Sequence, residues 1–160
     1  MKVSAHLHVE DIIHPWLIDR FGLMLCKRRL KKSRQYLLDT YEQIRELAGE
    51  HVMVNNYGDD LAYRRAVSMG HPGYSVIKGR PLHINNGVRI FNDPIGTDLS
   101  AHYLWDAMIL RCATVEPGYL KQWILDNPED FPHIVRIGSN DALHIEVAKT
   151  RDHSIEIYNP

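Results

Sequence analysis

The sequence has few cysteines, no long apolar run and almost no net charge, and each of these absences excludes a class of protein. Cys26 and Cys112 are its two cysteines, so the chain lacks the disulfide framework of small secreted domains. No apolar run approaches the roughly 18 residues that are needed to span a bilayer. The formal net charge is −1, so the total charge gives no reason to expect electrostatic capture of nucleic acid or of membranes. We expect both cysteines to be buried free thiols.

What remains fits one ordinary globular domain. The 160 residues are 44% hydrophobic and 24% charged, which is typical of a chain with one sizeable core. We predict a single domain over residues 1–160, with an inserted glycine-rich loop at about 57–80. The opening segment MKVSAHLHVEDII has no apolar core of the kind that a signal peptide needs. We therefore expect the protein to be made in the cytoplasm without a signal peptide.

The periodicity of apolar residues predicts an α+β fold. One long helix is expected in SRQYLLDTYEQIRELAGE, with Ser33 as its N-cap and Gly49 as its C-cap. The basic run KRRLKK, residues 27–32, is expected to be a solvated approach to this helix. Shorter helices are expected near EDIIHPWLIDRFG and EPGYLKQWILDNP, and the strands in HVMVNN, RPLHINNGVRIF, DAMILRCA, HIVRIG, ALHIEVA and HSIEIYN. This order of elements predicts a mostly antiparallel sheet packed against the long N-terminal helix and the shorter helices.

Two histidines lie beside acidic residues on well-defined elements. His102 follows Ser100 at the mouth of a predicted strand, and His144 belongs to the strand DALHIEV. In that strand His144 and Glu146 share one face, because side chains alternate. Asp141 lies three residues before His144, where a carboxylate could deprotonate a water on a metal held by that histidine. A solvated strand face would have the same pattern, so the residues alone leave both interpretations open.

Taken together, several segments resemble the zinc D-Ala-D-Ala carboxypeptidase and dipeptidase family, and most closely its small phage-type members with the hedgehog/DD-peptidase fold. The family's Ser-Gly-Tyr-Arg turn is similar to INNGVR, its Ser-x-His-x-x-Gly-x-Ala-x-Asp motif to GTDLSAHYLWDAMI, and its Glu-x-x-His closing motif to DALHIEV. Its first long helix and the following strand are similar to LLDTYEQIRELAGEHVMVNN. The resemblance covers nearly the whole chain and implies a hedgehog/DD-peptidase-like fold.

The resemblance also implies a role for each matched residue. His102 and His144 would bind zinc, and Asp141 would be the general base where the family usually has Glu. Arg89 would bind the substrate or stabilise the transition state, and Ser100 would contribute to substrate binding. If the site is active, its cofactor would be zinc and its substrate a peptidoglycan peptide.

Two positions of the motif depart from the family's pattern. Trp105 stands where the motif has Gly, and Ile109, which cannot bind a metal, stands where it has the Asp ligand. Asp106 could replace that ligand only if a β-bulge shifted the register by one, because it otherwise points away from the face of Ile109. His83, just before the Asn86–Gly87 turn, is another candidate third ligand, although a histidine at a sheet edge is the preferred explanation. Two protein ligands hold zinc much more weakly than three.

Three functions follow from these observations. The first hypothesis is a peptidase-like domain without catalysis or a necessary cofactor, which serves in a phage virion or in cell-wall recognition. Its partners would be peptidoglycan stem peptides or other virion proteins. The alternative is an active zinc-dependent peptidoglycan peptidase of the D-Ala carboxypeptidase or endolysin type. Nucleic-acid binding through residues 27–32 is disfavoured by the neutral total charge and by the lack of interleaved aromatic residues. We expect neither nucleic-acid binding nor membrane insertion.

Overall fold

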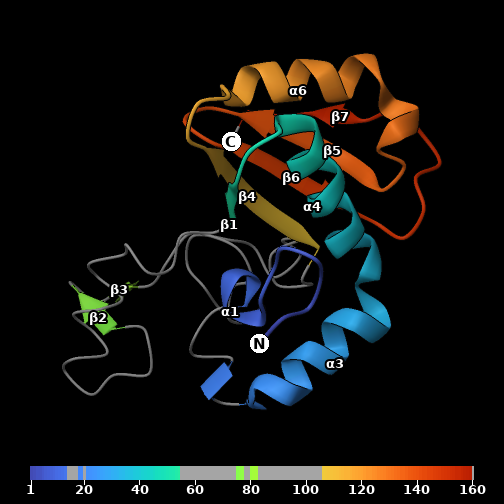
Figure 1. Ribbon diagram of the computed structural model, residues 1–160. Helices are drawn as coiled ribbons and strands as arrows, with labels where there is room; N and C mark the ends of the chain where they lie inside the picture. The colour runs from blue at the N-terminus through green and yellow to red at the C-terminus, as the bar shows by residue number, and fades with distance from the viewer. Residues whose placement is uncertain (14–17, 20, 55–74, 78–79, 83–105, 160) are drawn as a thin grey trace.

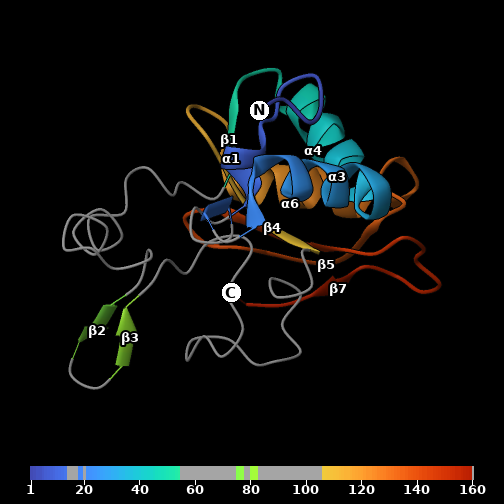
Figure 2. The ribbon, with the colours of Figure 1, turned by 90° about the horizontal axis from the view of Figure 1, so that it is seen from below.

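The computed structural model describes residues 1–13, 18–19, 21–54, 75–77, 80–82 and 106–159. These residues form an α+β architecture in which helices cover one face of a sheet (Figures 1 and 2), so the predicted α+β class is confirmed, while the hedgehog/DD-peptidase-like fold stays a prediction. The helices on this face are α1 (Val9–Ile12), α3 (Leu23–Ser33), α4 (Gln35–Ala48) and α6 (Pro117–Asp126), and the 3-10 helix η2 follows α6 at Pro128–Asp130.

The sheet has five strands in the order β1-β4-β6-β5-β7. The strands are β1 (Val52–Val54), β4 (Ala107–Cys112), β5 (Ile134–Ser139), β6 (Leu143–Val147) and β7 (Glu156–Ile157). All pairings are antiparallel except β5 with β7, which is parallel. The sheet is therefore mixed, because the chain passes beyond β5 after β6 instead of returning beside β6.

A separate two-stranded antiparallel ladder joins β2 (Ser75–Ile77) to β3 (Arg80–Leu82). β2 therefore falls inside the segment that was expected to be a loop, at about 57–80. The rest of that segment and the predicted Asn86–Gly87 turn lie outside the described residues.

The helical part differs from the prediction at one junction. Two helices stand where one was expected, because the basic run 27–32 is part of α3 and not a solvated approach to α4. Ser33 is the last residue of α3, and its Oγ donates to the backbone carbonyl of Arg29 at 2.8 Å. Arg34 is the N-cap of α4. Gly49 ends α4 as predicted, with the left-handed φ of 68° that favours glycine.

Alternation along the strands decides which side chains enter the core. In β6, Leu143, Ile145 and Val147 are buried in the main hydrophobic cluster. In β4, Met108 and Leu110 enter the same cluster, which also contains the buried faces of the four helices. Residues between these positions, including His144 in β6 and Ile109 in β4, therefore point to the other face of the sheet.

The two cysteines differ in burial, whereas both were expected to be buried. Cys26 and Cys112 do not form a disulfide; Cys26 is buried as expected, but Cys112 is partly exposed. Within the described part of the chain, none of the helices has the length and apolarity to cross a bilayer.

Candidate functional site

His144 lies in the middle of the sheet on the face opposite the helices. It is partly exposed, and its Nε2 is 3.2 Å from Oδ1 of Asn140 in the turn between β5 and β6. Since that amide oxygen can only accept, Nε2 is the donor in this contact. Asp141 is exposed in the same turn, so the histidine and the acid proposed as its base both lie at this end of β6.

The neighbours of His144 across the sheet are both unable to bind a metal. Ile109 is its direct partner on β4, and Gly138 is its direct partner on β5. Directly opposed Cβ atoms lie about 5 Å apart, so a side chain at position 109 is close enough to share a metal ion with His144. Ile109 is 4% exposed and makes this position apolar.

The acid that shares this face of β6 with His144 is already paired. Glu146 follows His144 by two residues and accepts from Arg136 Nη1 at 3.2 Å. Arg136 also lies 3.3 Å from the carboxylate of Glu156 on β7 and over the ring of Tyr158. In the described ranges, no group of three His, Cys, Asp or Glu side chains is arranged to hold a metal ion.

Asp106 lies on the helix side of the sheet, away from the face of His144. Its carboxylate accepts from Tyr36 Oη at 2.5 Å and pairs with Arg34 Nε at 2.8 Å. The β4–β6 ladder is regular from Ala107 to Leu110, and the backbone carbonyl of Asp106 accepts from Val147 at 2.8 Å. The register shift that would turn Asp106 towards His144 is therefore not present at these positions.

The contacts of Asp106 form a partly buried polar cluster between β4 and the junction of α3 and α4. Burial and the hydrogen bond to Asp106 raise the pKa of Tyr36 to about 12, so the phenol keeps its proton at neutral pH and donates it to the carboxylate. Burial also raises the pKa of Asp106, while the hydrogen bond from Tyr36 and the charge of Arg34 act in the opposite direction. The ring of Tyr36 packs against His133, with 5.8 Å between the ring centroids.

The other residues that the sequence singled out cannot be placed. Arg89, Ser100, His102, Trp105 and His83 lie outside the described residues. The predicted convergence of His102 and His144 therefore stays a prediction.

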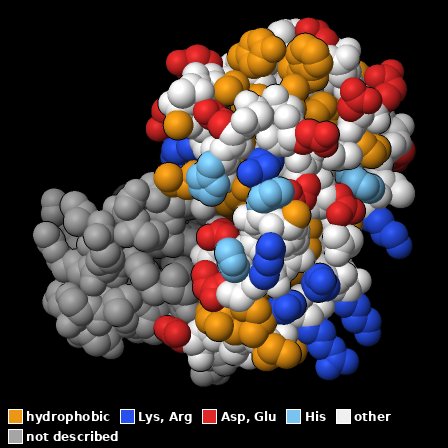
Figure 3. Space-filling model, viewed as in Figure 1, with side chains coloured by type: hydrophobic (Ala, Val, Ile, Leu, Met, Phe, Trp, Pro, Cys, Tyr) orange, Lys and Arg blue, Asp and Glu red, His pale blue; other side chains and the backbone are white. Residues whose placement is uncertain are grey.

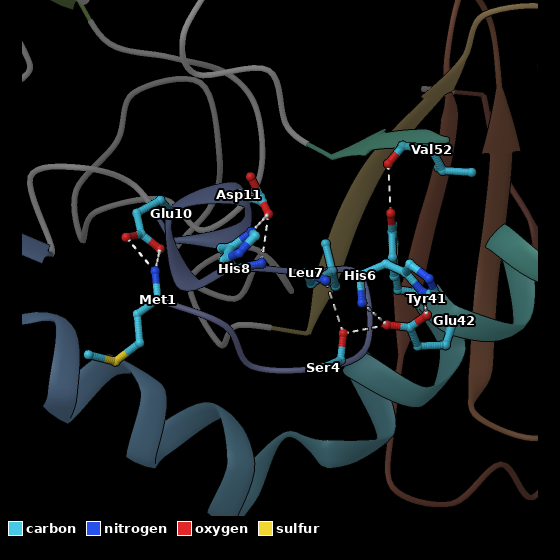
Figure 4. Close-up of polar contacts among 10 residues, drawn as sticks. All are labelled: Met1, Ser4, His6, Leu7, His8, Glu10, Asp11, Tyr41, Glu42 and Val52. Carbon is cyan, nitrogen blue, oxygen red and sulfur yellow. Dashed lines mark hydrogen bonds and ion pairs between the residues drawn. The ribbon is translucent and has the colours of Figure 1, made fainter. Parts of the chain in front are cut away.

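A second polar cluster attaches the N-terminal segment to α4 (Figure 4). Glu42 accepts hydrogen bonds from Ser4 Oγ at 2.5 Å, from the His6 backbone N–H at 2.9 Å and from His6 Nδ1 at 2.7 Å. The carboxylate stands between the hydroxyl and the imidazole, whereas a serine nucleophile needs the imidazole beside its hydroxyl. This cluster therefore holds two segments together and does not activate Ser4.

We expect Glu42 to make stability depend on pH. Burial alone would raise the pKa of its carboxyl, but the hydrogen bonds from Ser4 and His6 outweigh it and lower the pKa below 4.5. A lowered pKa in the folded state stabilises the protein above pH 4.5, and this stabilisation is lost as the pH falls through the lower value. Glu42→Gln should lower the free energy of unfolding by about 1–2 kcal/mol at pH 7. It should also reduce the loss of stability that occurs as the pH is lowered into the acid range.

Chemical denaturation of wild type and Glu42→Gln at a series of pH values would measure this effect. Glu46→Gln is the matched control, because Glu46 is exposed on the same helix. If the two variants lose the same stability at pH 7 and share the wild-type slope in acid, the hydrogen bonds of Glu42 have no net effect.

Both clusters join residues that are far apart in the chain, and for this reason no sequence motif indicates them. Ser4 and Glu42 are 38 positions apart, and Tyr36 and Asp106 are 70 apart. The one visible signal was Asp106 itself, a charged residue at the start of an apolar strand.

Comparisons with known proteins were negative. The chain matches no family model, and neither a curated protein nor a solved structure was found to be similar to it.

Proposed function

We propose that this chain is a peptidase-like domain without catalytic activity, which serves a binding or structural role. Its partners would be peptidoglycan stem peptides or other proteins of a phage particle, as the resemblance to small phage-type peptidases implies. The observation that carries the proposal is the pairing of His144 with Ile109 and Gly138. A zinc ion on His144 would find no ligand on either adjacent strand at this level of the sheet.

The position of Asp106 supports the same conclusion. Turning its carboxylate to the face of His144 would break the contacts with Tyr36 and Arg34 and leave the partly buried Tyr36 hydroxyl without this acceptor. Because a catalytic zinc site usually has three protein ligands, a site with His102 and His144 as its ligands would be incomplete.

Zinc content and hydrolysis measured on one preparation would test this proposal. The protein, purified without chelators and dialysed against zinc, should hold well below one equivalent of metal and release no fragments from purified peptidoglycan. It should still co-sediment with insoluble peptidoglycan or with phage particles. Stoichiometric zinc that is lost in both His102→Ala and His144→Ala, together with fragment release, would establish the alternative, an active zinc-dependent peptidase.

A further inference from the structure

The surface of α3 combines a dense positive charge with exposed apolar side chains. Between Leu23 and Ser33 the helix has five cationic residues and no acidic one: Lys27, Arg28, Arg29, Lys31 and Lys32. The whole chain has a formal charge of −1, so the remainder without these five carries −6. The balanced total charge therefore conceals a strong local asymmetry.

The apolar side chains lie beside the first turn of the same helix. Met24 is 69% exposed, Leu25 53% and Phe21 51%, although most residues of this size are buried elsewhere in the described chain. The side of α3 that packs against the core carries different residues, the buried Cys26 and Leu30. Figure 3 shows the Lys and Arg side chains gathered over α3 at the lower edge of the molecule, next to hydrophobic side chains.

A hollow of about 450 Å³ combines both kinds of side chain. It is lined by Phe21 and Leu25 on the apolar side and by Arg28, Arg29 and Lys32 on the cationic side. Nucleic acid would need only the cations, because phosphates dominate its affinity. Burial of exposed Met, Leu and Phe side chains lowers the free energy of binding only where the partner also has an apolar region, as a lipid bilayer does.

We infer that α3 docks this protein on the surface of an anionic phospholipid bilayer. The cations would contact lipid phosphates, while Met24, Leu25 and Phe21 would enter the boundary between headgroups and acyl chains. This is peripheral adsorption of one helix face and does not require a membrane-spanning segment. The inference is independent of the proposed loss of zinc chemistry.

Co-sedimentation with vesicles would test the inference. The protein should pellet with phosphatidylcholine and phosphatidylglycerol mixed at about two to one, but not with phosphatidylcholine alone, and binding should weaken as salt is raised. Lys31→Glu/Lys32→Glu should lower the partition coefficient at least about 30-fold, because each cation near an anionic surface contributes roughly fivefold. Met24→Gln/Leu25→Gln should lower it about tenfold at low salt.

Two control variants separate this surface from a general effect of charge or apolar area. Lys121→Glu/Lys149→Glu changes two cations outside α3, and Tyr119→Gln/Trp123→Gln removes exposed hydrophobic side chains from α6. Both should bind vesicles as wild type does, and circular dichroism and thermal melts would verify that every variant is folded.

Several results would overturn the inference. The first two are equal binding to neutral and anionic vesicles, and equal losses of vesicle binding in the α3 variants and the control variants. The other two are pelleting of the protein without vesicles, and binding to duplex DNA but not to vesicles. The last two would assign α3 to self-association or to nucleic acid.

Discussion

Replacing Ile109 with aspartate is expected to tighten zinc binding by at least about 100-fold, or about 2.7 kcal/mol. Position 109 is directly opposite His144 across the β4–β6 ladder, so a carboxylate there would lie within reach of a metal bound to that histidine. If the proposed resemblance to zinc peptidases holds, His102 would be the third ligand. The substitution would therefore restore the Asp ligand of the motif, although Trp105 would still stand at its Gly position.

The same variant should be unstable without metal. Ile109 is 4% exposed, and placing an unpaired carboxylate there should cost about 3 kcal/mol. Zinc at about 100 times its dissociation constant would stabilise the folded variant by about 2.7 kcal/mol. Thermal melts should therefore show a loss of roughly 10 °C in chelator and a recovery of most of it in zinc, whereas wild type should change little.

Two control variants decide whether the metal uses the intended ligands. Ile109→Asn places a polar group in the same position without the anionic ligand, and Ile109→Asp/His144→Ala keeps the carboxylate but removes its partner. Neither should respond to zinc in calorimetry or in melts. A folded Ile109→Asp variant that binds zinc no better than Ile109→Asn would show that a side chain at position 109 cannot act as a zinc ligand beside His144.

Asp106→Ala is expected to lower the free energy of unfolding by about 3 kcal/mol. The substitution removes the acceptor of the Tyr36 hydroxyl and one ion-pair partner of Arg34, whose side chain is 21% exposed. Asp106→Asn keeps an acceptor for Tyr36 and should lose about half as much. Urea denaturation would measure the free energy of unfolding of both variants. Asp126→Ala is the control, because it removes an exposed carboxylate on α6 that accepts a hydrogen bond from Gln122. It should lower the free energy of unfolding by less than about 0.5 kcal/mol.

A double-mutant cycle would isolate the contact between Tyr36 and Asp106. Tyr36→Phe removes the hydroxyl and keeps the ring that packs against His133. The coupling energy with Asp106→Ala should be about 1–2 kcal/mol. Strictly additive losses would mean that the hydrogen bond contributes nothing beyond the ion pair with Arg34.

These two predictions concern one feature of the molecule, the register of β4. The contacts of Asp106 with Tyr36 and Arg34 hold the start of the strand against the helices, and the same register sets Ile109 opposite His144. A one-residue slip would exchange the faces of Asp106 and Ile109. The polar cluster on the helix side therefore helps to keep an apolar residue at the ligand position on the other side.

Local pattern alone determined the class of the fold and most of its strands. The alternation in ALHIEVA predicted that His144 and Glu146 share a face, and the structure confirms it. Gly49 marked the end of α4 because a left-handed residue there favours glycine. The alternation of DAMILRCA also indicated that Asp106 and Ile109 point to opposite faces, and no tertiary contact was needed to see this.

Tertiary structure decided which of these elements are neighbours. The pairing of Ile109 with His144, the contacts of Asp106 and the parallel addition of β7 all join segments that are distant in the chain. The helical state of residues 27–32 was also missed, because their charges suggest solvent and the buried Cys26 and Leu30 supply the contacts that stabilise the helix. Periodicity reports the local conformation and the face of a side chain, whereas the partner across a sheet depends on how the whole chain packs.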